Sequence, residues 1–201
     1  MEGNLLTKTA ELAMTVTLQY VREGDFVIDA TCGNGHDTLA LSKACGEQGS
    51  VLAVDLQEQA IRNSSRLLSG EGVSNTTFVQ GDFLYLRNYV TENFGDKRPR
   101  AVVFNLGYLP GGDKSVTTTA ESSAAAVRQA LSLIEPGGIV TAVLYWGHTE
   151  GKAERDAVLH LAQTLSPKEY HTAYTSFPNQ KKNPPEVLWI TKKAEVSRSA
   201  K

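Results

Sequence analysis

Short apolar runs alternate with segments that carry apolar residues at helical spacing along most of this chain. The first run, residues 26–30, is too short for a helix and is bounded by Gly24 and Gly33, which indicates a buried strand. Repeated strand–helix alternation predicts a mainly parallel sheet with right-handed crossovers. We expect strands at residues 26–30, 50–55, 76–80, 100–105, 138–144, 170–176 and 186–191, and helices at residues 5–21, 37–44, 57–68, 121–133 and 152–165.

The first strand leads into a glycine loop. Asp29 stands at the strand end, Gly33-x-Gly35 follows, and a helical pattern begins near Asp37. Such a unit forms a small-ligand cradle, because glycines let the backbone approach the ligand and helix N–H groups face it. The nicotinamide fingerprint needs a third glycine where Thr38 stands. The pattern instead resembles motif I of the class I S-adenosylmethionine (SAM)-dependent methyltransferases; the alternative is an ordinary strand–helix turn.

The next two strands are also followed by acids. Asp55 closes the second strand, where a carboxylate can accept both ribose hydroxyls of an adenosine ligand, and Gln57 is close enough to reach the adenosine. Asp82 resembles the methyltransferase residue that accepts a hydrogen bond from the adenine amino group, and Phe83 would pack on the ring. The alternative for Asp55 is a helix cap. Acids at three successive strands favour cofactor binding.

The fourth strand runs into Asn105-Leu106-Gly107-Tyr108, at the edge of the sheet where ligands bind in α/β folds. This tetrapeptide resembles the Asn-Pro-Pro-Tyr motif of methyltransferases that act on exocyclic amino nitrogens. The resemblance implies that Asn105 accepts a hydrogen bond from the target nitrogen and that Tyr108 stacks on the base. Leu106 and Gly107 replace the prolines, so the loop is less rigid. The alternative is a polar strand end with an exposed tyrosine.

The loop after the fifth strand carries Tyr145, Trp146 and His148. His148 is the candidate general base, because the unperturbed pKa of histidine lies near neutrality. Tyr145 and Trp146 are candidates for stacking a splayed base. A single loop histidine is more often only a hydrogen-bonding group, and the sequence leaves open which group takes the proton.

Composition excludes several classes of protein. At 201 residues we expect one domain at residues 1–193 and a disordered tail at 194–201. No apolar run approaches the roughly 20 residues of a membrane span, and no signal peptide is visible, so we expect a cytoplasmic protein without membrane contact. Cys32 and Cys45 lack metal-ligand spacing and are expected as reduced thiols, and no metal is expected.

The net charge of −2 excludes nucleic-acid binding by bulk charge but leaves room for a local basic patch. Lys114, Lys181 and Lys182 flank the loops at the strand ends. We expect these three lysines to contact phosphates. The alternative is an ordinary solvated surface.

Taken together, these segments are similar to the small bacterial family labelled rRNA methylases, over essentially the whole chain. The most specific pieces are residues 29–38, 105–114 and 145–148. The resemblance implies a Rossmann-like class I methyltransferase fold of the α/β class, with a mainly parallel seven-stranded sheet, an antiparallel last strand and helices on both faces. It implies SAM as cofactor and the anticodon stem-loop of tRNA as partner. The reaction would methylate the aminomethyl nitrogen of a wobble uridine to give 5-methylaminomethyl-2-thiouridine.

Other functions remain open at this stage. The protein could methylate another RNA position, such as one in rRNA, or a small molecule. It could also be a non-catalytic cofactor-binding module that acts as an RNA chaperone, and homodimer formation is left open. The candidate cofactor-binding residues are Asp29, Gly33, Asn34, Gly35, Asp37, Asp55, Gln57, Asp82 and Phe83; the candidate catalytic residues are Asn105, Tyr108 and His148; and the candidate substrate-binding residues are Lys114, Tyr145, Trp146, Lys181 and Lys182.

Overall fold

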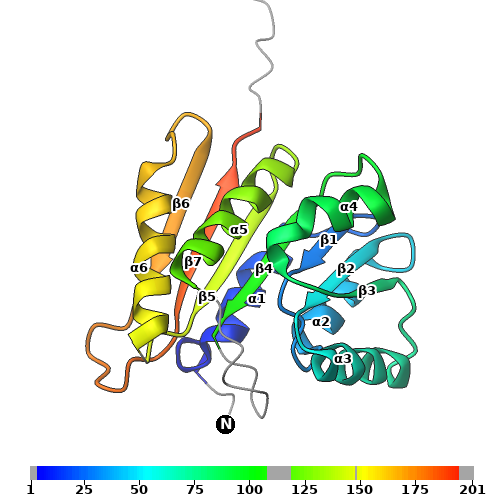
Figure 1. Cartoon of the computed structure of the whole chain (residues 1–201), viewed down its shortest axis with the longest axis horizontal. Helices are drawn as coiled ribbons and strands as arrows, with labels where there is room; N and C mark the ends of the chain where they lie inside the picture. Colours follow the sequence, from blue (N-terminus) through cyan, green and yellow to red (C-terminus); the bar gives the residue numbers. More distant parts are fainter. Residues whose placement is uncertain (1–3, 108–118, 148, 195–201) are drawn as a thin grey trace, which may run out of the picture.

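A computed structural model describes residues 4–107, 119–147 and 149–194 of the chain. A single sheet with the strand order β3-β2-β1-β4-β5-β7-β6 runs through the molecule (Figure 1). Its strands are β1 (Phe26–Asp29), β2 (Ser50–Asp55), β3 (Thr76–Gln80), β4 (Ala101–Leu106), β5 (Ile139–Leu144), β6 (Tyr170–Thr175) and β7 (Glu186–Lys192).

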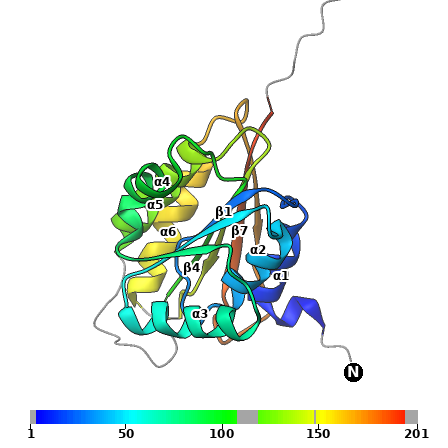
Figure 2. The same cartoon turned by 90° about the vertical axis from the view of Figure 1, so that its right-hand side faces the viewer.

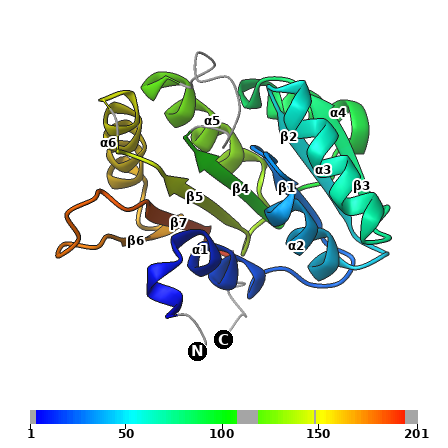
Figure 3. The ribbon, with the colours of Figure 1, turned by 90° about the horizontal axis from the view of Figure 1, so that it is seen from below.

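The direction of the strands confirms the expected mixed sheet. The strands from β3 to β5 are parallel neighbours, and β7 is antiparallel to both β5 and β6. Since β5 and β6 therefore run the same way, the connection from β6 to β7 leaves the sheet at the edge where β4 and β5 also end. Figure 3 looks onto this carboxyl edge from below.

Helices cover both faces of the sheet, with α1 and α2 on one side and α4, α5 and α6 on the other (Figure 2). All five predicted helices are present, with ends shifted by up to four residues. The N-terminal one is shorter than expected, because Asn4 caps a separate 3₁₀ turn by accepting from the Leu6 N–H. The helical elements are η1 (Leu5–Thr7), α1 (Thr9–Leu18), α2 (His36–Cys45), α3 (Glu58–Gly70), η2 (Phe83–Tyr85), α4 (Leu86–Phe94), α5 (Ala120–Leu133) and α6 (Thr149–Thr164).

One helix, α4, was not expected from the sequence. Its buried residues are Leu86 and Val90, four positions apart, and the other positions of its nine-residue span are mostly polar. Two buried positions give too weak a period to be recognised alone. The helix is held by packing, since Leu86 and Val90 belong to the apolar cluster on that side of the sheet.

The central strands β1, β2, β4 and β5 are buried on both faces, which explains why they are almost continuously apolar. Every residue of β5 is buried. The helix α1 docks on this strand through a buried hydroxyl pair, Thr17 and Thr141, whose oxygens are 2.7 Å apart. Within the described ranges, no helix is long and apolar enough to cross a bilayer.

Candidate active site

A cavity of about 480 Å³ opens at the carboxyl edge of the sheet. Its volume lies within the range of about 300–1,000 Å³ that is common for small-ligand sites. It collects residues from the ends of five strands and from the start of α1 and α5. The predicted site residues that line it are Gly33, Asn34, Asp37, Asp55, Gln57, Asp82, Phe83, Asn105 and Tyr145.

The loop between β1 and α2 forms one wall, and its shape requires glycine. Gly35 has φ of +87°, and a Cβ atom there would lie 2.7 Å from the Cα of Ser64 on α3. The Ser64 hydroxyl in turn donates to the Gly33 carbonyl across 3.0 Å. The loop is therefore clamped against α3. Gly35 contacts α3 on the side of the loop that faces away from the cavity, since Gly35 does not itself line the cavity.

Asp29 lies beneath this loop and is fully buried. One carboxylate oxygen accepts the Thr38 hydroxyl at 2.6 Å and the other accepts the Thr31 N–H at 3.2 Å. Burial, reinforced by the negative charge of Asp37, raises the pKa of Asp29 to about 7. Asp29 does not line the cavity, and its hydrogen bonds to Thr31 and Thr38 anchor the loop from beneath.

Asp55 joins the loop to the next crossover. Its two oxygens accept the N–H groups of Gly33 and Gln57, each across 3.0 Å. Burial raises the pKa of Asp55, and these backbone hydrogen bonds oppose the rise. A carboxylate has about four acceptor positions, so both oxygens can still receive hydroxyl groups from a ligand.

The far end of the cavity combines an acid with apolar side chains. One oxygen of Asp82 accepts the Leu84 N–H at 2.9 Å. Phe83 is only 7% exposed and meets Phe104 edge-on, so it offers the cavity little of its ring. Leu56, which is 50% exposed, supplies more apolar surface there. Sequence reasoning missed Leu56, although it directly follows the acid that ends β2.

Asn105 stands at the centre of the site. Its backbone N–H donates to the Thr31 hydroxyl at 2.6 Å, and its side-chain Nδ2 donates to Asp37 Oδ2 at 2.7 Å. Burial raises the pKa of Asp37, and the hydrogen bond from Asn105 opposes the rise. Tyr145 lines the same cavity as this pair, and burial and then the charge of Asp37 raise the pKa of its hydroxyl.

Tyr145 also explains a departure from the proline-containing motif. A Cβ atom at Gly107 would lie 2.8 Å from the Cβ of Tyr145, and the Tyr145 N–H donates to the Leu106 carbonyl at 3.0 Å. The tyrosine therefore occupies the space that a side chain at position 107 would need.

Several predicted substrate residues lie elsewhere. The indole N–H of Trp146 donates to the Pro184 carbonyl at 3.0 Å, and the Arg155 guanidinium lies 4.2 Å from its ring centre. Trp146 does not line the cavity. Lys181 and Lys182 are exposed on the β6–β7 connection. Tyr108, Lys114 and His148 lie outside the described residues, as do 195–201 of the predicted tail.

Other residues line the cavity without a role predicted for them. Thr119 and Ser122 form a capping box at the start of α5, although Ser122 stands where the usual sequence pattern has Glu or Gln. Ala10 lies on α1, and nothing in the sequence around it indicates that it would line the cavity. The lining residues without a predicted ligand role are Ala10, Ala30, Thr31, Cys32, His36, Leu56, Gly81, Gly107, Thr119 and Ser122.

The charge of the cavity fits a cationic ligand. Three carboxylates line it, those of Asp37, Asp55 and Asp82, while no lysine or arginine among the described residues does. A sulfonium next to an adenosine matches these three carboxylates, because a carboxylate can face the cation and can accept hydrogen bonds from the ribose hydroxyls and the adenine amino group. The glycine loop lets the backbone come close to the ligand. The residues present therefore fit SAM.

Fold and cleft together define a class I SAM-dependent methyltransferase fold, as expected. The model of the family described as "Putative rRNA methylase" matches residues 51–191. The chain belongs to this family. The model of the protein-L-isoaspartate(D-aspartate) O-methyltransferase family matches residues 4–85.

Individual relatives agree with this assignment. The chloroplastic tRNA (mnm(5)s(2)U34)-methyltransferase of Arabidopsis thaliana is 39% identical over 163 residues, 75% of this chain and 57% of that protein. A "putative rRNA-methylase" structure from Clostridium thermocellum has a TM-score of 0.86 and 35% identity, with 92% of this chain and 97% of that chain covered. A methyltransferase from Streptococcus mutans, solved with SAH, has a TM-score of 0.82 and 30% identity, with 96% and 99% covered. The chain spans little more than half the length of its Arabidopsis relative.

Proposed function

We propose that this protein is a SAM-dependent methyltransferase that methylates an amino nitrogen in tRNA. The observation that carries the proposal is the position of Asn105, which lines the same cavity as the glycine loop. Its backbone N–H bonds to Thr31 in that loop, and its side chain bonds to Asp37 in the first turn of α2. An acceptor amide next to the cofactor site suits an amine substrate, because it can bind an N–H and leave the nitrogen lone pair free.

SAM supplies a methyl group that is already activated on a sulfonium. In the proposed site, Asp55 accepts hydrogen bonds from the ribose hydroxyls and Asp82 accepts one from the adenine amino group. Leu56 and the edge of Phe83 pack on the ring, and residues 31–35 surround the methionine end. These roles make binding and alignment the main task of the chain, and alignment is the larger part of catalysis for a direct displacement.

The amine must lose its proton before it can accept the methyl group. Asn105 Oδ1 then accepts one of its remaining hydrogens, and the ring of Tyr145 borders the same space. The carboxylates of the cavity favour the protonated amine on entry, so the proton has to leave within the site. His148 stays our candidate for accepting it.

The substrate we propose is the aminomethyl group of a wobble uridine, methylated to 5-methylaminomethyl-2-thiouridine. Support for this choice comes from the name of the Arabidopsis relative, which is a tRNA (mnm(5)s(2)U34)-methyltransferase. We further propose that Lys181 and Lys182, together with Lys114, contact phosphates of the anticodon stem-loop.

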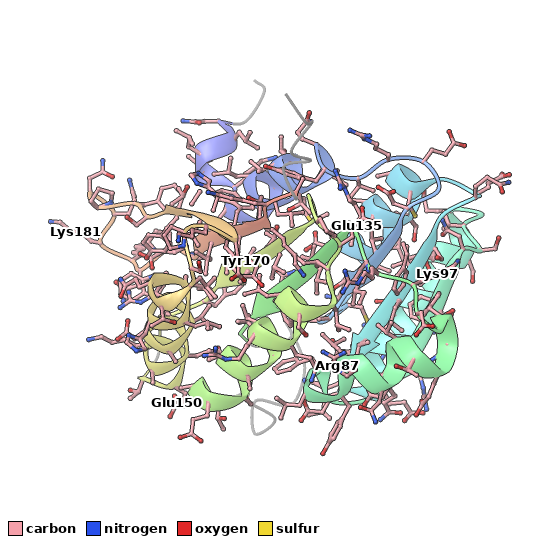
Figure 4. The ribbon with its side chains drawn as sticks, turned by 90° about the horizontal axis from the view of Figure 1, so that it is seen from above. Arg87, Lys97, Glu135, Glu150, Tyr170 and Lys181 are labelled. Carbon is pink, nitrogen blue, oxygen red and sulfur yellow. The ribbon has the colours of Figure 1, made fainter. Side chains whose placement is uncertain are left out.

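The two lysines on the β6–β7 connection suit that role better than the other basic segments. Lys181 projects from the connection, which leaves the sheet at the carboxyl edge that also holds the cavity (Figure 4). The basic residues from Lys97 to Arg100 precede β4 and so lie at the opposite edge, where Arg100 pairs with Glu135 across 3.1 Å.

Mass spectrometry of tRNA nucleosides tests the proposal. tRNA that carries 5-aminomethyl-2-thiouridine is incubated with SAM and either the wild-type protein or Asn105→Ala. We expect one added methyl group at that nucleoside with the wild-type protein and little with the variant. Methylation of rRNA or of a free metabolite, with tRNA unchanged, would replace this function with one of the alternatives.

A further inference from the structure

The hydrogen bond between Asp37 and Asn105 joins two different parts of the fold. Asp37 is in the first turn of α2, and Asn105 is near the end of β4. The separation of 2.7 Å between Nδ2 and Oδ2 is typical of a hydrogen bond to a charged carboxylate. A second hydrogen bond, from the Asn105 N–H to the Thr31 hydroxyl, joins the end of β4 to the loop that follows β1. Asn105 is therefore fixed both at its backbone and at its side chain.

The partner fixes which way the amide of Asn105 faces. An ionised carboxylate only accepts hydrogen bonds, so the amide must present its nitrogen to Asp37 and its oxygen to the other side. In the described part of the chain, no residue donates to Asn105 Oδ1. If the amide were flipped, its NH₂ group would face the acceptor site and would compete for the lone pair that attacks the methyl group.

We propose that Asp37 is a positioning residue for methyl transfer, which holds the Asn105 amide with its oxygen toward the reacting amine. The inference rests on the proposed function, because it assumes an amine that Asn105 contacts. It also differs from the role that the sequence predicts for Asp37, which is contact with the cofactor. A cofactor contact would act on SAM affinity, whereas a positioning residue acts on turnover through Asn105.

Steady-state kinetics and calorimetry separate these two roles. In Asp37→Asn the new amide can pair with Asn105 in either orientation, so we expect kcat to fall about 10- to 100-fold, as small misplacements do. SAM affinity should fall by a much smaller factor. Asp37→Glu keeps an acceptor-only carboxylate and should retain more turnover. Glu121→Gln, which removes an exposed carboxylate from α5, is the matched control and should change neither quantity.

A double-mutant comparison shows whether Asp37 acts through Asn105. In an Asn105→Ala background, Asp37→Asn should cause no further loss of kcat. If Asp37→Asn instead lowers SAM affinity and kcat by the same factor in both backgrounds, Asp37 is a cofactor ligand and the positioning role is wrong. Unchanged kcat in Asp37→Asn would overturn it as well.

Nuclear magnetic resonance gives a readout that needs no substrate. The side-chain NH₂ signal of Asn105 is identified by its loss in Asn105→Ala, and we expect it to move in Asp37→Asn but not in Glu121→Gln. If the wild-type protein methylates no tRNA, the proposed function fails, and this signal still decides the inference. An Asn105 signal that is the same in Asp37→Asn and wild type would overturn the positioning role by itself.

Discussion

The backbone N–H of Asn105 donates to the hydroxyl of Thr31 across 2.6 Å, although the two residues are 74 positions apart. The Thr31 N–H itself donates to the buried carboxyl of Asp29. The cofactor loop, the proposed acceptor residue and the buried anchor therefore form one connected unit. Displacing Thr31, which bonds to both of the others, should disturb both cofactor binding and the alignment of the amine.

Thr31→Val tests the central connection. Valine has nearly the same shape as threonine but cannot accept the Asn105 N–H, and a half-buried donor that loses its partner costs about 1 kcal/mol, the low end of the range for a buried one. We expect the free energy of unfolding in urea to fall by about that amount and kcat to fall as well. Thr31→Ser keeps the hydroxyl and should lose less of both; an equal loss in the two variants would show that the hydroxyl is not the cause.

Gly35→Ala tests the clamp between the cofactor loop and α3. Gly35 and Gly24 have nearly equal φ angles of +87° and +88°, but a Cβ at Gly24 has nothing within 4 Å, whereas one at Gly35 meets the Cα of Ser64 at 2.7 Å. Gly24→Ala should cost about 1 kcal/mol for its backbone conformation alone. Gly35→Ala should cost clearly more in chemical denaturation and should weaken SAM binding in calorimetry. Equal costs would mean that the contact with α3 is not rigid.

The central strands could be predicted because they are buried on both faces and appear as continuous apolar runs, as in β5. Two of the three acids of the cavity, Asp55 and Asp82, were predictable for a related reason, since parallel strands end at one edge and these acids stand at or just after such ends, whereas Asp37 lies in the first turn of α2. Contacts made by tertiary packing left no comparable trace. Ala10 reaches the cavity only because α1 docks on β5, and the helix α4 is defined by two buried residues.

Trp146 illustrates a second limit of the sequence. Sequence reasoning placed Tyr145 and Trp146 together on the rim, but successive side chains that continue from a strand point to opposite sides. Tyr145 consequently lines the cavity, while Trp146 contacts Pro184 and Arg155. Which of two neighbouring aromatic residues faces a ligand depends on the twist and register at the strand end, and composition does not reveal it.

Asp55 and Asn105 should separate cofactor binding from turnover. Asp55 accepts hydrogen bonds from two backbone N–H groups, and Asp55→Asn places an NH₂ group against one of them. The same change removes an acceptor for a ribose hydroxyl. We expect SAM affinity in calorimetry to fall about 10- to 100-fold, equivalent to about 1.4–3 kcal/mol, with kcat at saturating SAM less affected. Asn105→Ala should do the reverse. If both variants lost affinity and turnover in the same proportion, this division of roles would be wrong.

The lysines of the β6–β7 connection should control the salt dependence of tRNA binding. Each phosphate contact contributes about 0.7–0.9 to the slope of log affinity against log salt, so Lys181→Gln/Lys182→Gln should reduce that slope by up to about 1.4–1.8. The pair Lys97→Gln/Arg98→Gln removes the same charge just before β4, at the opposite edge of the sheet, and should leave the slope nearly unchanged. Equal reductions for the two pairs would indicate a non-specific charge effect.

Asp29 should make the stability of the fold depend on pH in an unusual direction. Its pKa in the folded protein is about 7, compared with an ordinary value of 3.8, because burial disfavours the charged carboxylate. Between those two values the folded state keeps a proton that the unfolded chain has lost. The contribution of Asp29 to the free energy of unfolding therefore falls as pH rises, by up to ~1.4 kcal/mol per pH unit, and levels off above about pH 7.

Asp29→Asn removes this titration, so the comparison with wild type isolates it from all other carboxylates. The difference in unfolding free energy, variant minus wild type, should increase from about pH 4 to about pH 7 and stay constant above that. Urea denaturation at a series of pH values measures it. A difference that does not change across this window would show that Asp29 is ionised throughout, with the Thr38 hydroxyl and the Thr31 N–H sufficient to stabilise its buried charge.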